Sequence, residues 1–548
     1  MNGQWRELPE AFRLMDEYIK RWMEAMRTPG MAVALFDRER CHRISTYGCM
    51  DLGTGAPVTP DTLFEIGSIT KTFTAVAVLQ AAEVGLLDLH APITAYLPWF
   101  QVQSAYEPIT IHHLLNHSAG MIGIIDQSPD IYSAVWMLRE TELAWPPGKQ
   151  FLYSDAGYQV LALILEAVTG KTYPEIIQQI IFHPLGMEDS SPVQVHAIRP
   201  RTAKGYTSLY DDRPSHRSHP LVEVPWIEVC SGECGIASTA GDMAKFAQML
   251  LNRGRGPAGR VLAEGSFELM IQNPMEVDWL HCQYGYGLEI HNTTYEGVQH
   301  LAHGGGMPGY EARMVVDMEN GIGVVMLSSR PSATSITWKL MSLWRAAYLG
   351  QTPGSVDLSI HNAMHVENAA EYEGTYFCEN KVLNLIADGD RLVLSATGMR
   401  VALEQRGKDA FYVPHPDFDH FLLRFGREPT EGEGKGLVTE AFYGEDWYLN
   451  SRYHGPRTFD VPDEWRAYPG HYRAHIPWQT NFRILLRKGA LWWVHPEGAE
   501  EPLFSLSDGS FRLGDAPSPE RIRFSQFIQG KAHYALLSGS SYYRFFTP

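Results

Sequence analysis

The pattern of apolar positions divides the first part of the chain into strands and helices. Residues 9–27 place apolar side chains at alternating steps of three and four, which predicts an amphipathic helix packed on a larger body. Segments 31–37 and 42–50 predict the two strands of a hairpin, because Pro29-Gly30 ends the helix just before them. A long helix-rich stretch follows, from about residue 68 to residue 260.

Two strong strand patterns return late in this part of the chain. Segments 310–317 and 322–329 flank an Asn-Gly pair at 320–321, which is typical of a tight hairpin turn. Residues 334–349 then predict a closing helix. We expect the early and late strands to share one antiparallel sheet. Residues 1–350 are thus predicted to form a mixed α/β (α+β) domain, an antiparallel sheet flanked by helices with an inserted all-helical lobe.

The pattern changes after residue 350. Residues 351–366 are predicted to be a linker, and short alternating segments with turn residues follow it, which favours all-β structure. The segment EYEGTY at 371–376 is echoed by AYPGHY at 467–472, and each copy precedes an apolar strand, a turn with Gly and a second apolar strand. This repeat predicts two small antiparallel β-barrel-like domains, 367–460 and 461–548.

Composition narrows the class of protein. The hydrophobic fraction of 45% and the charged fraction of 20% are those of a globular protein, and they exclude a disordered chain, a collagen or a long coiled coil. The net charge of −18 argues against a nucleic-acid partner, because phosphate backbones would repel it. The longest apolar stretches, 72–82 and 158–168, fall short of the roughly 20 residues of a membrane span.

The cysteine content and the start of the chain bear on location. Six cysteines among 548 residues are too few for a disulfide scaffold. The first residues are charged and lack the apolar region of a signal peptide. We therefore expect a cytoplasmic protein with free thiols and no membrane association. The sequence does not indicate an oligomeric state.

The first candidate for chemistry is the segment FEIGSITKTFTA at 64–75. Ser68 and Lys71 are three residues apart where a helical pattern begins, so the hydroxyl and the amine would lie on one helix face. The helix N-terminus would favour negative charge that develops near Ser68. A serine needs a neighbouring base to become a good nucleophile. An S-x-x-K spacing alone also occurs on many helix surfaces, so it needs support from other motifs.

Two further segments supply that support. The segment 153–155 reads Tyr-Ser-Asp, and the segment 303–306 reads His-Gly-Gly-Gly just before a predicted strand. Gly304 and Gly305 beside a strand edge would let a substrate lie close to the backbone. They would also leave a backbone N–H free to stabilise an oxyanion.

Together the three motifs resemble the serine β-lactamase and penicillin-binding protein superfamily. The order S-x-x-K, Y-x-N and H-x-G or K-T-G is similar to its class C-like branch. Segments 110–120, 182–187 and 235–251 are similar to connecting segments of that family, and the resemblance covers about residues 25–350. Two barrels after such a domain are similar in layout to the D-aminopeptidases of the superfamily.

The resemblance implies a role for each motif residue. Ser68 would attack a carbonyl carbon and form an acyl-enzyme, and Lys71 would accept or relay its proton. Tyr153 would act with Lys71 as general base and acid and would protonate the leaving group. His303 takes the place of the third-motif lysine and would orient the Tyr153 hydroxyl or a substrate carboxylate. Backbone N–H groups of Ser68 and Gly306 would hold the oxyanion.

Asp155 departs from the family pattern, which has Asn there. A carboxylate within about 4–6 Å would raise the pKa of Lys71 by roughly one to three units and hinder it as a base. Three arrangements stay open: Asp155 is protonated, it faces elsewhere, or Lys71 stays charged and Tyr153 is the base, which we favour. Asp155 could also bind a positive substrate group such as a free N-terminal amine, or accept a local hydrogen bond.

The sequence therefore predicts a serine hydrolase that acts on amide or ester bonds of a small molecule or short peptide. The resemblance implies no metal or organic cofactor, and it favours a peptidase or amidase for short peptides with D-residues. The alternatives are a carboxylesterase, a weak β-lactamase or a non-enzymatic penicillin-binding sensor or pseudo-enzyme.

Other motifs in the chain suggest different chemistry, but the sequence supports them less strongly than the three motifs above. The segment 303–306 is also similar to the oxyanion motif of α/β-hydrolase esterases, but no serine has glycine at both −2 and +2. His113 and His117 have a zinc-like spacing without the glutamate of H-E-x-x-H, so His117 is interpreted as a structural hydrogen-bonding histidine. Cys230 and Cys234 are interpreted as buried or free thiols.

Overall fold

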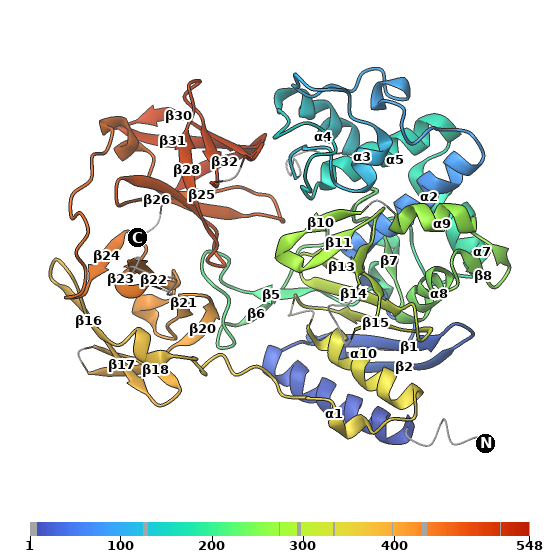
Figure 1. Ribbon diagram of the computed structural model, residues 1–548, viewed down its shortest axis with the longest axis horizontal. Coiled ribbons are helices and arrows are strands. Elements are labelled where there is room, and N and C mark those ends of the chain that lie inside the picture. Colours follow the sequence, from blue (N-terminus) through green and yellow to red (C-terminus); the bar gives the residue numbers. More distant parts are fainter. Residues whose placement is uncertain are drawn as a thin grey trace. The chain divides into compact units, whose positions relative to one another are not determined.

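The computed structural model describes residues 8–123, 130–272, 274–292, 297–331, 335–396, 398–428, 436–515 and 517–546 (Figure 1). The chain divides into two compact units. The N-terminal unit comprises Met1–Thr207 and Leu221–Leu358, and the C-terminal unit comprises Ser208–Pro220 and Ser359–Pro548.

One antiparallel sheet organises the N-terminal unit. Among the described residues it has nine strands in the order β10-β11-β12-β13-β14-β15-β1-β2-β3. The strands are β1 (Gly30–Asp37), β2 (Cys41–Asp51), β3 (Ala56–Pro57), β10 (Met275–Val277), β11 (Cys282–Tyr284), β12 (Glu289–His291), β13 (His300–Met307), β14 (Tyr310–Asp317) and β15 (Ile322–Ser328). β1 pairs with β15, with Met31 opposite Ser328, which confirms that early and late strands share one sheet.

The sequence patterns explain these elements. Every residue of β1 and of β15 is buried, as their apolar runs require. The predicted hairpin joins β14 to β15, and Gly321 takes a φ of +72° at its turn. The predicted first helix is α1 (Leu8–Met26), and the closing helix is α10 (Ser335–Tyr348). α1 and α10 pack against each other, and α10 also packs against β15 (Figure 1).

The helix-rich stretch supplies the elements that hold the site. α2 (Thr70–Glu83) is buried from Thr70 to Leu79 on every side, so its first turn is fixed in place. It packs against α5 (Asp155–Thr169), which begins at the N-cap Ser154 and ends at Gly170 with a φ of +68°. The stretch also contains α3 (Ile111–Leu115), α4 (Ile131–Met137), α6 (Tyr173–Ile177), α7 (His183–Leu185), α8 (Ala240–Leu251) and α9 (Glu264–Ile271).

The C-terminal unit contains two barrel-like sheets, as the sequence predicted. Within the described ranges, the first sheet has nine strands in the order β19-β18-β17-β16-β24-β23-β22-β21-β20, and β25 to β32 form a closed barrel. The strands of the first sheet are β16 (Gly374–Cys378), β17 (Lys381–Asp388), β18 (Arg391–Ala396), β19 (Met399–Ala402), β20 (Glu404–Gly407), β21 (Ala410–Tyr412), β22 (Leu423–Glu428), β23 (Leu437–Tyr443) and β24 (Asp446–Leu449). Those of the barrel are β25 (Gly470–Arg473), β26 (Asn481–Arg487), β27 (Ala490–Val494), β28 (Glu500–Ser505), β29 (Phe511–Leu513), β30 (Arg521–Ile528), β31 (Lys531–Leu537) and β32 (Ser540–Phe545).

The sequence repeat has the same structural role in both sheets. The Tyr376 hydroxyl donates to the carbonyl oxygen of Tyr372 at 2.9 Å, and the Tyr472 hydroxyl donates to that of Tyr468 at 2.7 Å. Both donor side chains are fully buried. The repeat thus marks a buried tyrosine that fixes the chain where it enters each barrel-like sheet.

Segment 208–220 belongs to the C-terminal unit, although in the chain it begins at the last residue of β5 (Tyr206–Ser208) and ends just before β6 (Leu221–Glu223). Arg213 pairs with Asp419 at 2.7 Å, and His216 Nε2 lies 3.0 Å from Glu404. The sequence pattern gave no sign of this association, because it depends on polar pairs about 200 residues apart.

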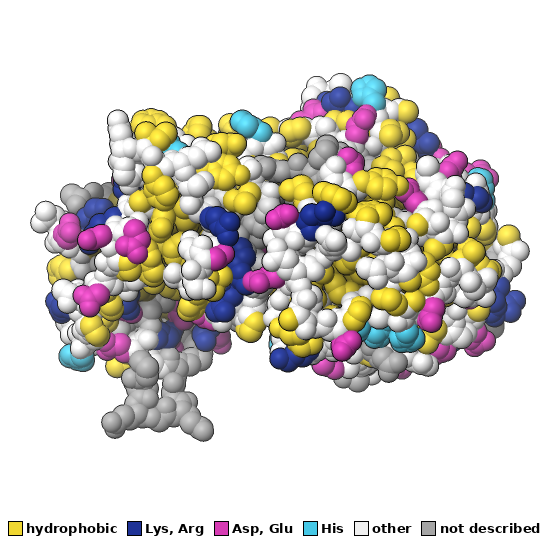
Figure 2. Space-filling model, turned by 90° about the horizontal axis from the view of Figure 1, so that it is seen from above, with side chains coloured by type: hydrophobic (Ala, Val, Ile, Leu, Met, Phe, Trp, Pro, Cys, Tyr) yellow, Lys and Arg dark blue, Asp and Glu magenta, His cyan; other side chains and the backbone are white. Residues whose placement is uncertain are grey.

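The surface composition and the apolar character of the helices indicate whether the chain could contact or cross a membrane. On the face drawn in Figure 2, acidic and basic side chains are interspersed with apolar ones. Across the described residues, no helix has both the length and the apolar character needed to cross a membrane.

Candidate active site

Ser68 and Lys71 lie at the start of α2, as their spacing predicted. Ser68 is in the short 3-10 helix η2 (Gly67–Ile69) that leads directly into α2. The Lys71 Nζ donates to Ser68 Oγ at 2.9 Å and to the carbonyl oxygen of Glu233 at 3.2 Å. Lys71 is completely buried, whereas Ser68 is partly exposed. The hydroxyl can therefore meet a substrate while the amine stays within the protein.

Gly67 sets the position of Ser68. It has a φ of +51°, which L-residues with side chains rarely adopt. A Cβ there would lie 2.6 Å from the carbonyl oxygen of Gly306 and 2.7 Å from its nitrogen. Just upstream, β4 (Phe64–Glu65) pairs with β7 (Ala237–Ser238), which anchors the chain that leads to Ser68. Only glycine at 67 lets η2 pack this closely against β13.

Tyr153 and Asp155 reach the same place from α5. The Ser154 hydroxyl accepts a hydrogen bond from the Gly157 N–H at 3.1 Å and caps the helix. Asp155 follows in the first turn, and its Oδ1 lies 2.5 Å from Lys71 Nζ. Lys71 Nζ lies 4.9 Å from the centroid of the Tyr153 ring, and both Lys71 and Ser68 lower the pKa of the Tyr153 hydroxyl. The alternative that Asp155 faces away from Lys71 is therefore wrong.

The charges of this cluster follow from burial and pairing. Burial lowers the pKa of Lys71, but attraction to Asp155 and Tyr153 outweighs it and holds the pKa above its ordinary value. Burial raises the pKa of Tyr153 to about 12, against the opposing effect of the Lys71 ammonium. At neutral pH the resting site thus contains a lysine cation and a neutral tyrosine. This is the charge state of Lys71 that the third sequence alternative requires.

His303 lies in β13 and has partners on both ring nitrogens. Its Nδ1 donates to the Gly304 carbonyl oxygen at 2.6 Å, so its Nε2 accepts from the Tyr284 hydroxyl at 2.8 Å. It is only 2% exposed, and burial lowers its pKa to about 4. His303 is neutral, and it orients Tyr284 and the Gly304 peptide. The roles that the resemblance implies for His303, orienting the Tyr153 hydroxyl or a substrate carboxylate, stay predictions.

The glycines of β13 allow its close approach to the nucleophile. A Cβ at Gly305 would overlap the carbonyl oxygen of Ile66 and lie 3.1 Å from the Ser68 nitrogen. Gly306 is exposed beside Gly67, with open space where its Cβ would be. The structure thus brings the Ser68 and Gly306 peptides to one edge of β13. Their role as oxyanion donors, and that of Gly304 and Gly305 in substrate binding, stay predictions.

Several residues of the site carried no recognisable signal in the sequence. Glu233 is 3% exposed, and its Oε1 accepts from Gln159 Nε2 at 3.0 Å. Burial raises the pKa of Glu233, while its carbonyl oxygen accepts from Lys71. Tyr284, from β11, contacts His303. Both residues reach the site through tertiary packing alone, so no local spacing could have identified them.

His117 was expected to be structural, and its contacts agree. Its Nδ1 accepts from the Ser154 N–H at 3.0 Å, and its ring centroid lies 4.3 Å from that of Tyr153. His113 contacts Thr110 in the capping box of α3. The two histidines therefore serve different local structures. Cys230 is an exposed free thiol and Cys234 a buried one.

One buried group of residues has the composition of a metal site. Cys282, Glu289 and His291 bring ligand atoms within 4.8 Å of one another. However, Arg313 donates to both Glu289 oxygens, at 2.8 and 2.5 Å. A divalent cation would have to displace this guanidinium, so the group fits a buried ion pair better than a metal centre.

A serine, a buried lysine and a tyrosine that converge beside a glycine-rich strand define the site of an S-x-x-K serine hydrolase. The family model described as Beta-lactamase matches residues 15–336. The chain therefore belongs to the beta-lactamase family of serine hydrolases, which also includes penicillin-binding proteins.

Known proteins show the same relationship. Penicillin-binding protein 4 of Amycolatopsis lactamdurans is 30% identical over 332 residues, which cover 57% of this chain and 86% of that protein. Penicillin-binding protein 4* of Bacillus subtilis is 24% identical over 392 residues, which cover 67% and 84%. The octameric penicillin-binding protein homologue from Pyrococcus abyssi has a similar fold, with a TM-score of 0.59 and 23% identity over 80% of this chain and 100% of that one.

Proposed function

We propose that the protein hydrolyses amide or ester bonds of small molecules or short peptides through an acyl-enzyme at Ser68. One observation carries the proposal: Lys71 Nζ lies 2.9 Å from Ser68 Oγ and 4.9 Å from the centroid of the Tyr153 ring. Lys71 is fully buried, whereas Ser68 is partly exposed. This arrangement gives a nucleophile, a fixed cation and a phenol whose ionised form can accept a proton.

The direction of the hydrogen bond between Lys71 and Ser68 supports Tyr153 as the base. An ammonium can only donate, so Ser68 Oγ is the acceptor in its bond with Lys71. The Ser68 hydroxyl hydrogen is then free to go to the Tyr153 oxygen. In the reactive form Tyr153 has lost its own proton to solvent, and the Lys71 ammonium stabilises the resulting phenolate. As Oγ bonds to the substrate carbonyl carbon, the phenolate takes the Ser68 proton and becomes a neutral phenol.

The remaining steps use the same groups. Tyr153 passes its proton to the leaving amine or alcohol as the scissile bond breaks, which leaves an acyl-enzyme at Ser68. Water then attacks the ester, with Tyr153 again as base. Backbone N–H groups of Ser68 and Gly306 would hold the oxyanion in both steps, each contributing about 3–4 kcal/mol. His303 and Tyr284 would position the strand that carries Gly306.

We further propose that the substrates are short peptides with a D-residue. The protein would then belong to the class C-like branch and resemble its D-aminopeptidases. Two lines of similarity support this. Relatives are named penicillin-binding proteins, and a 28% identical protein of Staphylococcus aureus is named teichoic acid D-alanine hydrolase, with 37% of this chain covered and 52% of that one. The two C-terminal barrel-like sheets match the expected layout.

The test combines active-site labelling with a matched substrate panel. Intact-mass measurement after a fluorophosphonate or penicillin probe would show one adduct on the wild type and none on Ser68→Ala. D- and L-aminoacyl p-nitroanilides beside p-nitrophenyl esters then report turnover, with D-anilides preferred if the proposal holds.

Each other outcome points to a different protein. Turnover of esters alone would indicate a carboxylesterase, and turnover of penicillin a β-lactamase. A stable adduct without turnover would indicate a penicillin-binding sensor. No adduct with either probe would contradict a nucleophilic Ser68.

A further inference from the structure

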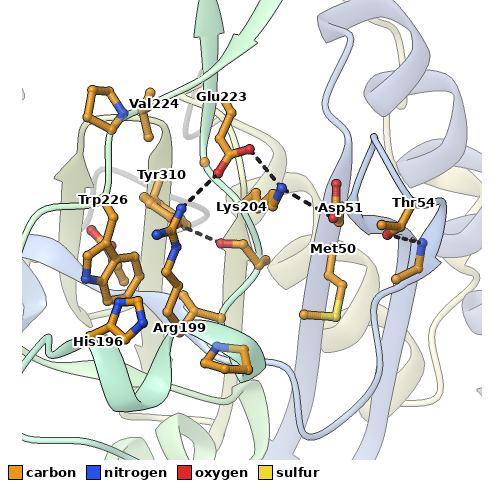
Figure 3. Close-up of a pocket in the computed structure, with 17 residues that line it drawn as sticks. Met50, Asp51, Thr54, His196, Arg199, Lys204, Glu223, Val224, Trp226 and Tyr310 are labelled. Carbon is orange, nitrogen blue, oxygen red and sulfur yellow. Dashed lines mark hydrogen bonds and ion pairs between the residues drawn. The ribbon is translucent and has the colours of Figure 1, made fainter.

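A cavity lies in the N-terminal unit apart from the candidate active site, and its lining does not include Ser68, Lys71 or Tyr153. It has a volume of about 420 Å³ and is lined by the segments around Met50, His196 and Val224, together with Glu65 and Tyr310 (Figure 3). A space of this size can hold a small organic molecule.

Most charges that line this cavity are already paired. Lys204 Nζ lies 2.8 Å from Glu223 and 3.3 Å from Asp51. Arg199 lies 3.6 Å from the other Glu223 oxygen, so Glu223 sits between the two cations (Figure 3). These two acidic and two basic groups balance one another. They leave no free charge for an anionic ligand.

Glu65 is the exception. It lines the same cavity, is only 4% exposed, and has no hydrogen-bond or ion-pair partner among the residues that the structure describes. Burial alone raises its pKa to about 8. An unpaired buried carboxyl group is costly, and a cation that enters the cavity would remove that cost.

The rest of the lining is aromatic and apolar. The Tyr310 hydroxyl donates to the Ala203 carbonyl oxygen at 2.7 Å, so its ring is fixed at the cavity wall. Trp226 supplies a second ring, and Met50 and Val224 add apolar surface (Figure 3). Aromatic faces favour cations as well as apolar groups. A bare metal ion would make no use of such walls, and its oxygen ligands Asp51 and Glu223 are held by Lys204.

We propose that this cavity binds a small organic amine, with its ammonium group on the Glu65 carboxylate and its apolar body, about the size of one ring, between Trp226 and Tyr310. This site is separate from the Ser68 site and does not depend on the proposed reaction. A neutral molecule of the same shape would leave Glu65 unpaired, so it would bind much more weakly.

Binding is coupled to pH through Glu65. The other charged or titratable groups that line the cavity are Asp51, His196, Arg199, Lys204, Glu223 and Tyr310. The ammonium pairs only with ionised Glu65, so binding releases a proton from it. With a pKa of about 8, the ionised fraction of Glu65, and with it the affinity, rises about ninefold from pH 6 to pH 7 and about fiftyfold from pH 6 to pH 8.

The experiment is calorimetric titration of the full-length protein with 2-phenylethylamine and, as the neutral match, 2-phenylethanol. We expect the amine to bind at pH 8 and the alcohol to bind at least tenfold more weakly. Glu65→Gln should weaken the amine at least tenfold and abolish the rise in affinity with pH. Asp61→Asn removes an exposed carboxylate outside the cavity and should change neither. The melting temperature of Glu65→Gln checks that it folds.

A repeat titration after Ser68 is labelled with a fluorophosphonate separates the two sites. Unchanged amine affinity supports a distinct cavity, whereas loss of binding would place the amine at Ser68 and overturn the proposal. Equal affinity for amine and alcohol, equal affinity in Glu65→Gln, or no binding of the amine at pH 8 would overturn it as well.

Discussion

Two ion pairs of the N-terminal unit, Lys71–Asp155 and Arg313–Glu289, are built differently. Lys71 and Asp155 meet at 2.5 Å, but Asp155 keeps 29% of its side chain exposed, and Lys71 also donates to Ser68 and Glu233. Arg313 and Glu289 make two hydrogen bonds, and both side chains are less than 10% exposed.

The difference indicates that the Lys71–Asp155 pair takes part in the reaction and that the Arg313–Glu289 pair stabilises the fold. The Arg313 guanidinium and the Glu289 carboxylate match in shape, and attraction to Arg313 overcomes burial and holds the pKa of Glu289 well below its ordinary value. Arg313 stands opposite Gly304 in the sheet, so this pair supports the strand that carries the glycines. Lys71 instead shares its hydrogens among several oxygens, one of which belongs to the nucleophile. We therefore expect one pair to control rate and the other to control stability.

The largest effect is expected from Lys71→Met. Removing the cation leaves Ser68 without its partner and Tyr153 without a charge to stabilise its anion. We expect kcat/KM to fall at least about 10⁴-fold, or ~5.5 kcal/mol. Stability should change by about 1 kcal/mol or less, because Asp155 can turn to water. Ester hydrolysis and thermal denaturation measure the two quantities.

Ser68→Ala is the control for Lys71→Met. Ser68→Ala should lower kcat/KM as far as Lys71→Met, and the double variant should be no worse, because the two groups act as one unit. A drop of only tenfold in Lys71→Met would show that Lys71 positions Ser68 without taking part in the reaction.

Arg313→Met should have the next largest effect, and on stability. It leaves Glu289 buried and without its main cation, which costs about 3–5 kcal/mol of unfolding free energy. Denaturant titration measures this loss. The double variant Arg313→Met with Glu289→Leu should recover most of it, since it removes the unpaired charge as well. A double variant as unstable as the single one would show that Arg313 acts through packing instead.

The sequence predicted the parts of the molecule that depend on local spacing. The apolar period located α1, the Asn-Gly pair located the turn between β14 and β15, and the three-residue step joined Ser68 to Lys71. The helix N-cap at Ser154 is equally local, and it brings Asp155 to Lys71.

What the sequence could not show depends on contacts between distant segments. The Glu233 carbonyl oxygen meets Lys71 across 162 positions, and Arg313 reaches Glu289 from the next but one strand of the sheet. The unpaired state of Glu65 is defined by the walls of a cavity and not by its neighbours in the chain. Such contacts depend on how strands and helices pack together, and the spacing of apolar residues along the chain does not predict that packing.

The smallest effect, and the most informative about mechanism, is expected from Asp155→Asn. Burial lowers the pKa of Lys71 and the Asp155 carboxylate raises it, so loss of the carboxylate should lower that pKa. In the wild type, Lys71 stays charged throughout, and kcat/KM should rise with pH toward the pKa of Tyr153, about 12. The variant should lose rate at lower alkaline pH than the wild type, because Lys71 becomes neutral there.

The direction in which Asp155→Asn changes the rate at neutral pH shows whether Lys71 or Tyr153 is the base. If Lys71 were the base, a lower pKa would increase its neutral fraction, and Asp155→Asn would be about tenfold faster at pH 7 for each unit of pKa lost. If Tyr153 is the base and Lys71 its cation, the rate at pH 7 changes little and the alkaline side falls. The same pH profiles, measured with esters that carry a free amine and with their N-acetylated forms, test whether Asp155 binds the amine. If it does, Asp155→Asn should lose affinity for the free-amine esters and not for the N-acetylated ones. An equal change for both substrates would leave Asp155 with one function, to keep Lys71 charged.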